Sequence, residues 1–202
     1  YNKFMKIQRP QSKQPIPENA RMVFKGVIFD VYQWEQKMFD GSKTTFEKLK
    51  RPDTVSIFPV LPDGKILLIE ENQPATDLTY IGPCGGRVDE GEDILATAKR
   101  ELLEETGYEA EEFILWDSKH PTTKIDWVVY TFIAKGLKKV ADAHLDEGEK
   151  IKLMTVTFDK LVDMVTNEKN DFDPEVGLKF FEAKFDPKKM EELKELFKPL
   201  GK

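Results

Sequence analysis

The stretch from Gly86 to Tyr108 constrains the fold of this 202-residue chain more than any other. It begins with a glycine after an apolar, strand-like segment, and Gly107 stands near its end, where a helix C-cap belongs. Apolar residues recur between these glycines at helical spacing, at Ile94, Leu95, Ala98 and Leu102. The pattern therefore predicts a strand, a glycine turn and a helix over about residues 93–106.

The polar side of this helix carries Glu101, Glu104 and Glu105. They stand at i, i+3 and i+4, so their carboxylates project from one side of the helix. Like charges at this spacing repel one another, and the single cation of Arg100 offsets only part of the repulsion. A divalent cation would offset more, because Mg²⁺ prefers carboxylate, water and phosphate oxygens as ligands. Taken alone, the run is also typical of a solvated helix face.

The residues around the glutamates decide between these interpretations. From Gly86 the sequence reads G-x5-E-x7-R-E-L-L-E-E-T-G-Y, which resembles the signature of the Nudix hydrolases. Seven fixed positions agree, and chance agreement is on the order of 10⁻⁸ per start position at average residue frequencies. Only Tyr108 departs, where the family usually has an aliphatic residue. The resemblance implies an enzyme that uses Mg²⁺, or Mn²⁺, to hydrolyse nucleoside diphosphates linked to another moiety.

The resemblance also implies roles for individual residues. The metal ligands would be Glu101, Glu105, Glu104 and the backbone carbonyl of Gly85. Arg100 and Glu92 would support the site by orienting the carboxylates, and Gly86 would let the backbone approach a phosphate. The metal would polarise the phosphoryl oxygens and help to generate a hydroxide nucleophile at neutral pH.

A general base is still needed, because the helix carboxylates, Glu105 included, hold metal. The acidic segment 144–149 precedes a predicted strand, and ADP-ribose pyrophosphatases, the subfamily that this chain most resembles, carry a catalytic glutamate in a similar E-x-E loop. Glu149 is the preferred base or extra metal ligand, and Glu147 is the second choice. An ordinary exposed acidic loop is the alternative.

The resemblance to that subfamily covers about residues 25–165. The substrate-binding residues that it implies are Phe46, Glu47, Arg51 and Gln73. Three departures concern the substrate. Gln73 stands where the subfamily commonly has an arginine, Gly82 stands where a glutamate often precedes the glycine loop, and Pro121 follows the signature sooner than the subfamily's proline does.

The order of predicted elements indicates an α/β (α+β) fold, since strands alternate with a few helices. We expect an N-terminal arm and β-subdomain over residues 1–50, which in the subfamily builds a dimer. A Nudix catalytic domain with C-terminal helices should follow over residues 51–202. Its expected architecture is the Nudix-type α/β/α sandwich with a mixed β-sheet.

Composition limits the partners. The net charge of −6 argues against nucleic acid as the main partner, because no basic excess is present to neutralise phosphates. The single cysteine, Cys84, fits a reducing compartment, and no apolar run is long enough to span a membrane. We therefore expect a cytoplasmic protein, and the resemblance to the ADP-ribose pyrophosphatases implies a homodimer that takes a small nucleotide-sugar substrate. The only histidines, His120 and His144, are expected to have surface roles.

The favoured reaction is hydrolysis of ADP-ribose to AMP and ribose 5-phosphate. Another nucleoside diphosphate sugar, such as GDP-mannose, is the first alternative. A non-catalytic Nudix-fold nucleotide sensor is the second, although a binding module need not keep three glutamates together. A hydrolase of dinucleoside polyphosphates or coenzyme A is a third, and no additional motif points to it.

Overall fold

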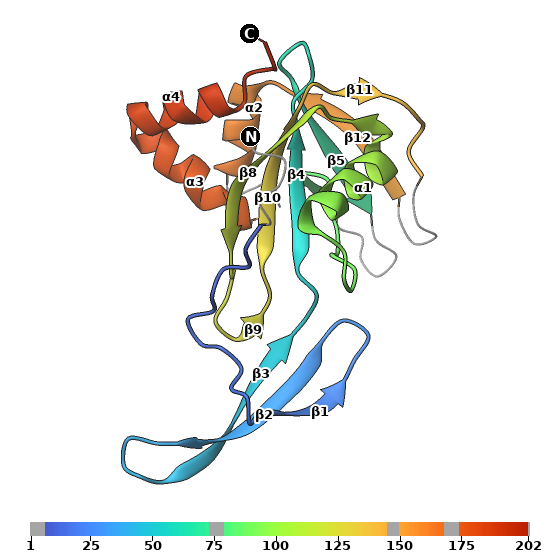
Figure 1. Cartoon of the computed structure of the whole chain (residues 1–202). Helices are drawn as coiled ribbons and strands as arrows, with labels where there is room; N and C mark the ends of the chain where they lie inside the picture. The colour runs from blue at the N-terminus through green and yellow to red at the C-terminus, as the bar shows by residue number, and fades with distance from the viewer. Residues whose placement is uncertain (1–6, 73–78, 145–149, 168–173, 202) are drawn as a thin grey trace.

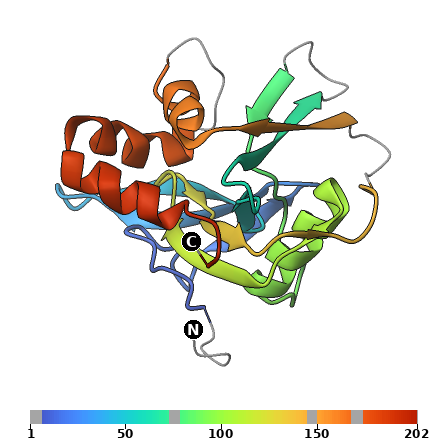
Figure 2. The ribbon, with the colours of Figure 1, turned by 90° about the horizontal axis from the view of Figure 1, so that it is seen from above.

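The computed structural model describes residues 7–72, 79–144, 150–167 and 174–201, and its helices lie on two sides of a central layer of strands (Figures 1 and 2). Helix α1 (Ile94–Thr106) covers one side, and helices α2 (Phe158–Val165), α3 (Pro174–Phe185) and α4 (Pro187–Leu196) cover the other. The chain therefore has the expected α/β/α arrangement.

Two three-stranded sheets form the central layer. In the first, β4 (Thr54–Pro59) pairs in parallel with β10 (Val129–Lys135), which pairs antiparallel with β8 (Glu112–Lys119). In the second, β5 (Ile66–Asn72) lies between β12 (Lys150–Val156) and β6 (Thr79–Gly82), antiparallel to both. The short strands β7 (Tyr108–Glu109) and β11 (Lys138–Lys139) form a separate pair. Parallel and antiparallel pairing thus coexist, as the predicted mixed sheet requires.

Two apolar clusters hold the layers together, one on each face of β4. Val55 and Ile57 belong to the cluster that includes Leu102 of α1, whereas Phe58 belongs to the cluster that includes Phe180 of α3. Successive side chains of a strand point to opposite faces, so a strand covered on both sides must be apolar at nearly every position. This explains the uninterrupted burial of β4 from residue 55 to residue 59.

A separate four-stranded sheet forms the arm at the bottom of Figure 1. Strands β1 (Arg21–Lys25), β2 (Asp30–Lys37) and β3 (Lys43–Lys50) follow one another antiparallel, and β9 (Ile125–Asp126) pairs in parallel with β3. Strands β1 to β3 lie within the first 50 residues, and the sheet also includes a strand from the second part of the chain. Strand β1 lies at the sheet's edge, and all five of its residues are exposed.

Polar contacts hold the segment before β1 against the rest of the chain. The guanidinium of Arg9 donates to both carboxylate oxygens of Asp53, at 2.8 and 3.0 Å, and to Asp126 at 3.1 Å. The buried ammonium of Lys48 donates to Ser12 of the same segment at 3.1 Å. Residues 7–16 thus have no regular structure, as predicted, but they are fixed by charged groups.

No helix in the described parts of the chain is long and apolar enough to cross a membrane. Three predicted site residues, Gln73, Glu147 and Glu149, lie outside the described residues.

Candidate active site

Helix α1 begins and ends where the sequence predicts. The Asp93 carboxylate caps its N-terminus by accepting hydrogen bonds from the backbone N–H groups of Leu95 and Ala96, at 3.0 and 3.3 Å. Gly107 is its C-cap, and the Gly107 N–H donates to the carbonyl of Leu103. These two ends fix which side of the helix carries the three glutamates.

Glu105 is buried, with only 6% of its surface exposed, and it faces the glycine turn. Its Oε2 accepts a hydrogen bond from the backbone N–H of Gly85 at 2.8 Å. Gly85 has φ +148°, and a Cβ at this position would lie 2.2 Å from the carbonyl oxygen of Val55 in β4. Only glycine can therefore bring the turn this close to both β4 and the Glu105 carboxylate.

The neighbouring glycine makes room for the second glutamate. A Cβ at Gly86 would lie 2.5–2.7 Å from the carboxylate atoms of Glu101. The Glu101 side chain is only 12% exposed, so its carboxylate is confined between the turn and the helix. In this structure the group that lies close to Gly86 is the Glu101 carboxylate, and the approach of a phosphate to Gly86 stays a prediction.

Arg100 connects the carboxylates to one another. Its Nη1 donates to Glu101 and Glu104, both at 2.9 Å, and its Nε and Nη2 donate to the two oxygens of Glu92 at 3.1 and 3.0 Å. The hydrogen bonds from Arg100 are the main reason that the pKa of Glu92 falls from 4.5 to about 2, and Thr97 adds a further hydrogen bond. Glu92 in turn raises the pKa of Arg100. Arg100 thus links Glu92 to Glu101 and Glu104, and the role of Arg100 and Glu92 in supporting a metal site stays a prediction.

The donor set suits a hard divalent cation. Glu101, Glu104 and Glu105 offer carboxylate oxygens on one side of α1, beside the backbone of Gly85. Among the described residues no three acidic, histidine or cysteine side chains already form a metal-binding group. In this structure Glu101 and Glu104 each accept a hydrogen bond from the Arg100 guanidinium. The chemistry of these residues therefore fits a divalent metal, with Arg100 as their cationic partner in this structure.

These groups line a cleft of about 540 Å³. Its walls come from the β1–β2 hairpin, the β3–β4 connection, the glycine turn, α1 and the segment after β11. The residues that line it are Ile28, Arg51, Pro52, Gly85, Gly86, Arg87, Asp89, Arg100, Glu101, Glu104, Glu105 and His144. The cleft therefore brings together seven residues that the sequence placed in the site. Glu92 contacts it through Arg100.

Arg51 contributes a cation to this cleft from outside the signature. Its guanidinium carbon lies 4.6 Å from the ring centre of Trp127 and 5.6 Å from that of Phe29. Within the described parts of the chain its side chain forms no ion pair, and its buried Nε has no hydrogen-bond partner. Burial lowers the pKa of Arg51 below its ordinary value of 12.5, but a group of this kind stays protonated. The cleft thus carries an unneutralised positive charge as well as the carboxylates.

Two predicted substrate-binding residues lie elsewhere in the chain. Phe46 is in β3 of the arm, and its ring centre lies 6.1 Å from that of Trp34. Glu47 accepts a hydrogen bond from Gln33 across the same sheet at 3.1 Å. Neither residue lines the cleft of its own chain.

Sequence reasoning missed several residues that line the cleft. Ile28 comes from the β1–β2 hairpin, and no local pattern links it to the signature. His144 is exposed, as expected, but it also lines the cleft, because its backbone N–H donates to the carbonyl of Glu104 at 2.7 Å. His120 does not have the expected surface role: its Nε2 lies 3.1 Å from the carbonyl oxygen of Pro10, and its Nδ1 is buried.

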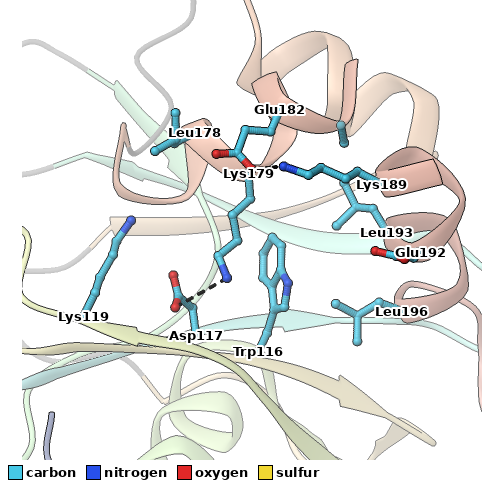
Figure 3. Close-up of a pocket in the computed structure, with 11 residues that line it drawn as sticks. Trp116, Asp117, Lys119, Leu178, Lys179, Glu182, Lys189, Glu192, Leu193 and Leu196 are labelled. Atoms are coloured by element: carbon cyan, nitrogen blue, oxygen red, sulfur yellow. Dashed lines mark hydrogen bonds and ion pairs between the residues drawn. The ribbon is translucent and has the colours of Figure 1, made fainter. Parts of the chain in front are cut away.

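A second cleft, of about 510 Å³, lies between β8 and helices α3 and α4 (Figure 3). Two ion pairs cross it. Lys179 lies 3.4 Å from the Asp117 carboxylate and over the ring of Trp116, and Lys189 lies 2.7 Å from Glu182. Its acidic residues, Asp117, Glu182 and Glu192, come from three different elements and not from one helix face, so the first cleft is the candidate active site.

Comparison with known proteins agrees with this geometry. The NUDIX domain matches residues 50–176. The ADP-ribose pyrophosphatase of Bacillus subtilis (strain 168) is 28% identical over 145 residues, which cover 71% of this chain and 78% of that protein. The methanol dehydrogenase activator of Bacillus methanolicus is 29% identical over 157 residues, covering 76% of this chain and 84% of that protein. A crystal structure of an ADP compounds hydrolase covers 89% of this chain and 98% of its own, with TM-score 0.67 and 22% identity, and shows the same fold.

A glycine turn and a glutamate-bearing helix, set beside a mixed sheet, define the class of Nudix pyrophosphohydrolases. The chain belongs to the Nudix family. Among the compared proteins it is similar to an ADP-ribose pyrophosphatase, and the family in general uses divalent metals.

Proposed function

We propose that this protein hydrolyses ADP-ribose to AMP and ribose 5-phosphate with Mg²⁺, and that Mn²⁺ can replace it. The observation that carries the proposal is the composition of the cleft: three glutamates for metal line the same space as the guanidinium of Arg51, which forms no ion pair with any described residue. A diphosphate bound to metal needs both, since its oxygens coordinate the metal and accept hydrogen bonds from a guanidinium. The similarity to an ADP-ribose pyrophosphatase supports the choice of substrate.

Each group has a defined task in this proposal. Glu101 and Glu105 are the principal metal ligands, with Glu104 and the Gly85 carbonyl as further ligands. The metal, when bound, supplies positive charge to the phosphoryl oxygens and lowers the pKa of the attacking water. Arg51 binds the diphosphate and sets its position. Water adds to one phosphorus, the bridging oxygen leaves with the other phosphate, and two monophosphates result.

The proton of the attacking water needs an acceptor. We assign this role to Glu149, with Glu147 as the alternative, because both follow the cleft-lining His144 by a few residues. Since the helix carboxylates are committed to metal, a base from another segment keeps the two tasks separate.

We also propose that the active form is a homodimer joined through the arm. Met22, Val23 and Phe24 of β1 are about half exposed, and Val27 beside them is 96% exposed. An edge strand with apolar residues on both faces favours association with a second copy. Neither Phe46 nor Glu47 lines the cleft of its own chain. In a dimer, the arm of the second subunit could bring its copies of these two residues toward that cleft. Light scattering at micromolar concentration tests this, and a monomer would contradict it.

A substrate panel tests the reaction. The purified protein is incubated with Mg²⁺ and, separately, ADP-ribose, GDP-mannose, UDP-glucose, NADH or diadenosine polyphosphates, and the nucleotide products are resolved by ion-exchange chromatography. Preferred cleavage of ADP-ribose, abolished by EDTA and restored by excess Mg²⁺, supports the proposal. Preferred cleavage of GDP-mannose would mean that GDP-mannose, and not ADP-ribose, is the substrate. Tight binding of one compound without turnover of any compound in the panel would indicate a sensor.

A further inference from the structure

The position of the Arg51 guanidinium needs a cause. An arginine side chain has many rotamers, and one without an ion pair normally extends into water. Here it lies over the ring of Trp127 and over that of Phe29, and its Nε is buried without a hydrogen-bond partner among the described residues. Stacking on ring faces holds a guanidinium by its plane, so the N–H groups at its edge stay available to an anion.

Backbone register places Trp127 beside Arg51. The Arg51 N–H donates to the carbonyl of Asp126 at 3.3 Å, and the Thr54 N–H donates to the carbonyl of Val128 at 3.0 Å. These two bonds lock the two segments together on either side of Trp127. The indole Nε1 then donates to the Thr54 hydroxyl at 3.0 Å, which fixes the orientation of the ring.

We infer that Trp127 is a positioning residue that presents Arg51 to the diphosphate of the substrate, with Thr54 holding the indole in place. The inference rests on the proposed function, in which Arg51 contacts the diphosphate. Trp127 itself does not line the cleft, so it acts through the guanidinium. Its effect therefore falls on substrate binding, because the glutamates proposed as metal ligands lie on α1 and remain in place.

Three substitutions test the contributions of the Trp127 ring and of the Thr54 hydroxyl separately. Trp127→Leu removes the ring face and the indole donor, Trp127→Phe keeps a ring face, and Thr54→Val removes only the hydroxyl acceptor. For Trp127→Leu we expect KM for ADP-ribose to rise about tenfold, with kcat within about twofold of wild type, which is the size of one cation–π contact. Trp127→Phe should recover most of the loss, and Thr54→Val should show a smaller rise in KM. A fall in kcat with unchanged KM would overturn the inference.

The matched control is Lys50→Met. Lys50 precedes Arg51 and lies 6.0 Å from the ring centre of Tyr32, but it lines a different cleft. Its loss should leave KM unchanged. Thermal unfolding of every variant separates misfolding from a specific effect, and Thr54→Val changes the fewest atoms if Trp127→Leu is unstable.

A double-mutant cycle on the binding of ADP, measured by calorimetry, tests the coupling without turnover. In wild type, Trp127→Leu should weaken ADP binding; in an Arg51→Met background it should have no further effect. Equal losses in both backgrounds, or no binding of ADP by the wild type, would overturn the inference. If the cycle behaves as expected but ADP-ribose is not hydrolysed, the proposed function fails while the positioning role of Trp127 stands.

Discussion

The pKa of Glu92 allows a quantitative test of the support beneath the metal ligands. Its fall from 4.5 to about 2 corresponds to at most about 3 kcal/mol of stability at neutral pH, at about 1.4 kcal/mol per pKa unit. The side chain is 21% exposed, so solvent screening reduces this to about 1–2 kcal/mol. Glu92→Gln should therefore lower the free energy of unfolding by about 1–2 kcal/mol at pH 7.

The pH dependence follows from the direction of the shift. A carboxylate whose pKa is lower in the folded state stabilises the fold above its unfolded pKa and loses this contribution as pH falls toward the folded pKa. The difference between wild type and Glu92→Gln should thus be full above about pH 5.5 and fall to less than half by about pH 3. Urea unfolding, followed by tryptophan fluorescence at several pH values, measures this difference in the free energy of unfolding.

The control is Glu90→Gln, which removes the same charge from an exposed neighbour. It should change stability by less than about 0.5 kcal/mol at every pH. A Glu92→Gln difference that does not vary with pH, or that equals the control, would refute the assignment of the low pKa to the Arg100 contact.

Three further predictions address other parts of the structure. Gly86→Ala should lower kcat at least tenfold, because its Cβ would displace the Glu101 carboxylate; activity near wild type would contradict this assignment. Gly177→Ala should stabilise the protein by about 0.5–1 kcal/mol, since a Cβ there meets its neighbours only at 3.9–4.0 Å in the interior of α3; a lower melting temperature would disagree. Glu149→Gln should lower kcat by orders of magnitude and Glu147→Gln only mildly; the reverse order would exchange the two roles.

The fold could be predicted from local signals because these are strong here. The Asp93 and Gly107 caps fix helix α1, and a largely apolar run, interrupted by Ser56, marks the doubly covered strand β4. The expected family and sandwich architecture are confirmed. The extent of the arm's sheet was not predictable, because β9 joins it from more than 70 residues downstream of β3.

Most of the predicted residues that line the cleft share one local segment, and Arg51 was predicted only through the resemblance to a family. The glycine turn and the glutamates of α1 meet through short-range geometry, and the structure places them in one cleft. Trp127 and Ile28 reach the region through pairing between distant strands, which leaves no mark in the sequence near Arg51. Long-range register is thus what the sequence alone could not show.

The central proposal is metal-dependent cleavage of ADP-ribose by the glutamates of α1. The most direct test compares wild type with Glu105→Gln in Mg²⁺ with ADP-ribose as substrate, with AMP and ribose 5-phosphate quantified and folding checked by circular dichroism. We predict both products from wild type and a loss of at least 100-fold in kcat for the folded variant. No AMP from wild type, or near-normal turnover by Glu105→Gln, would contradict the proposal.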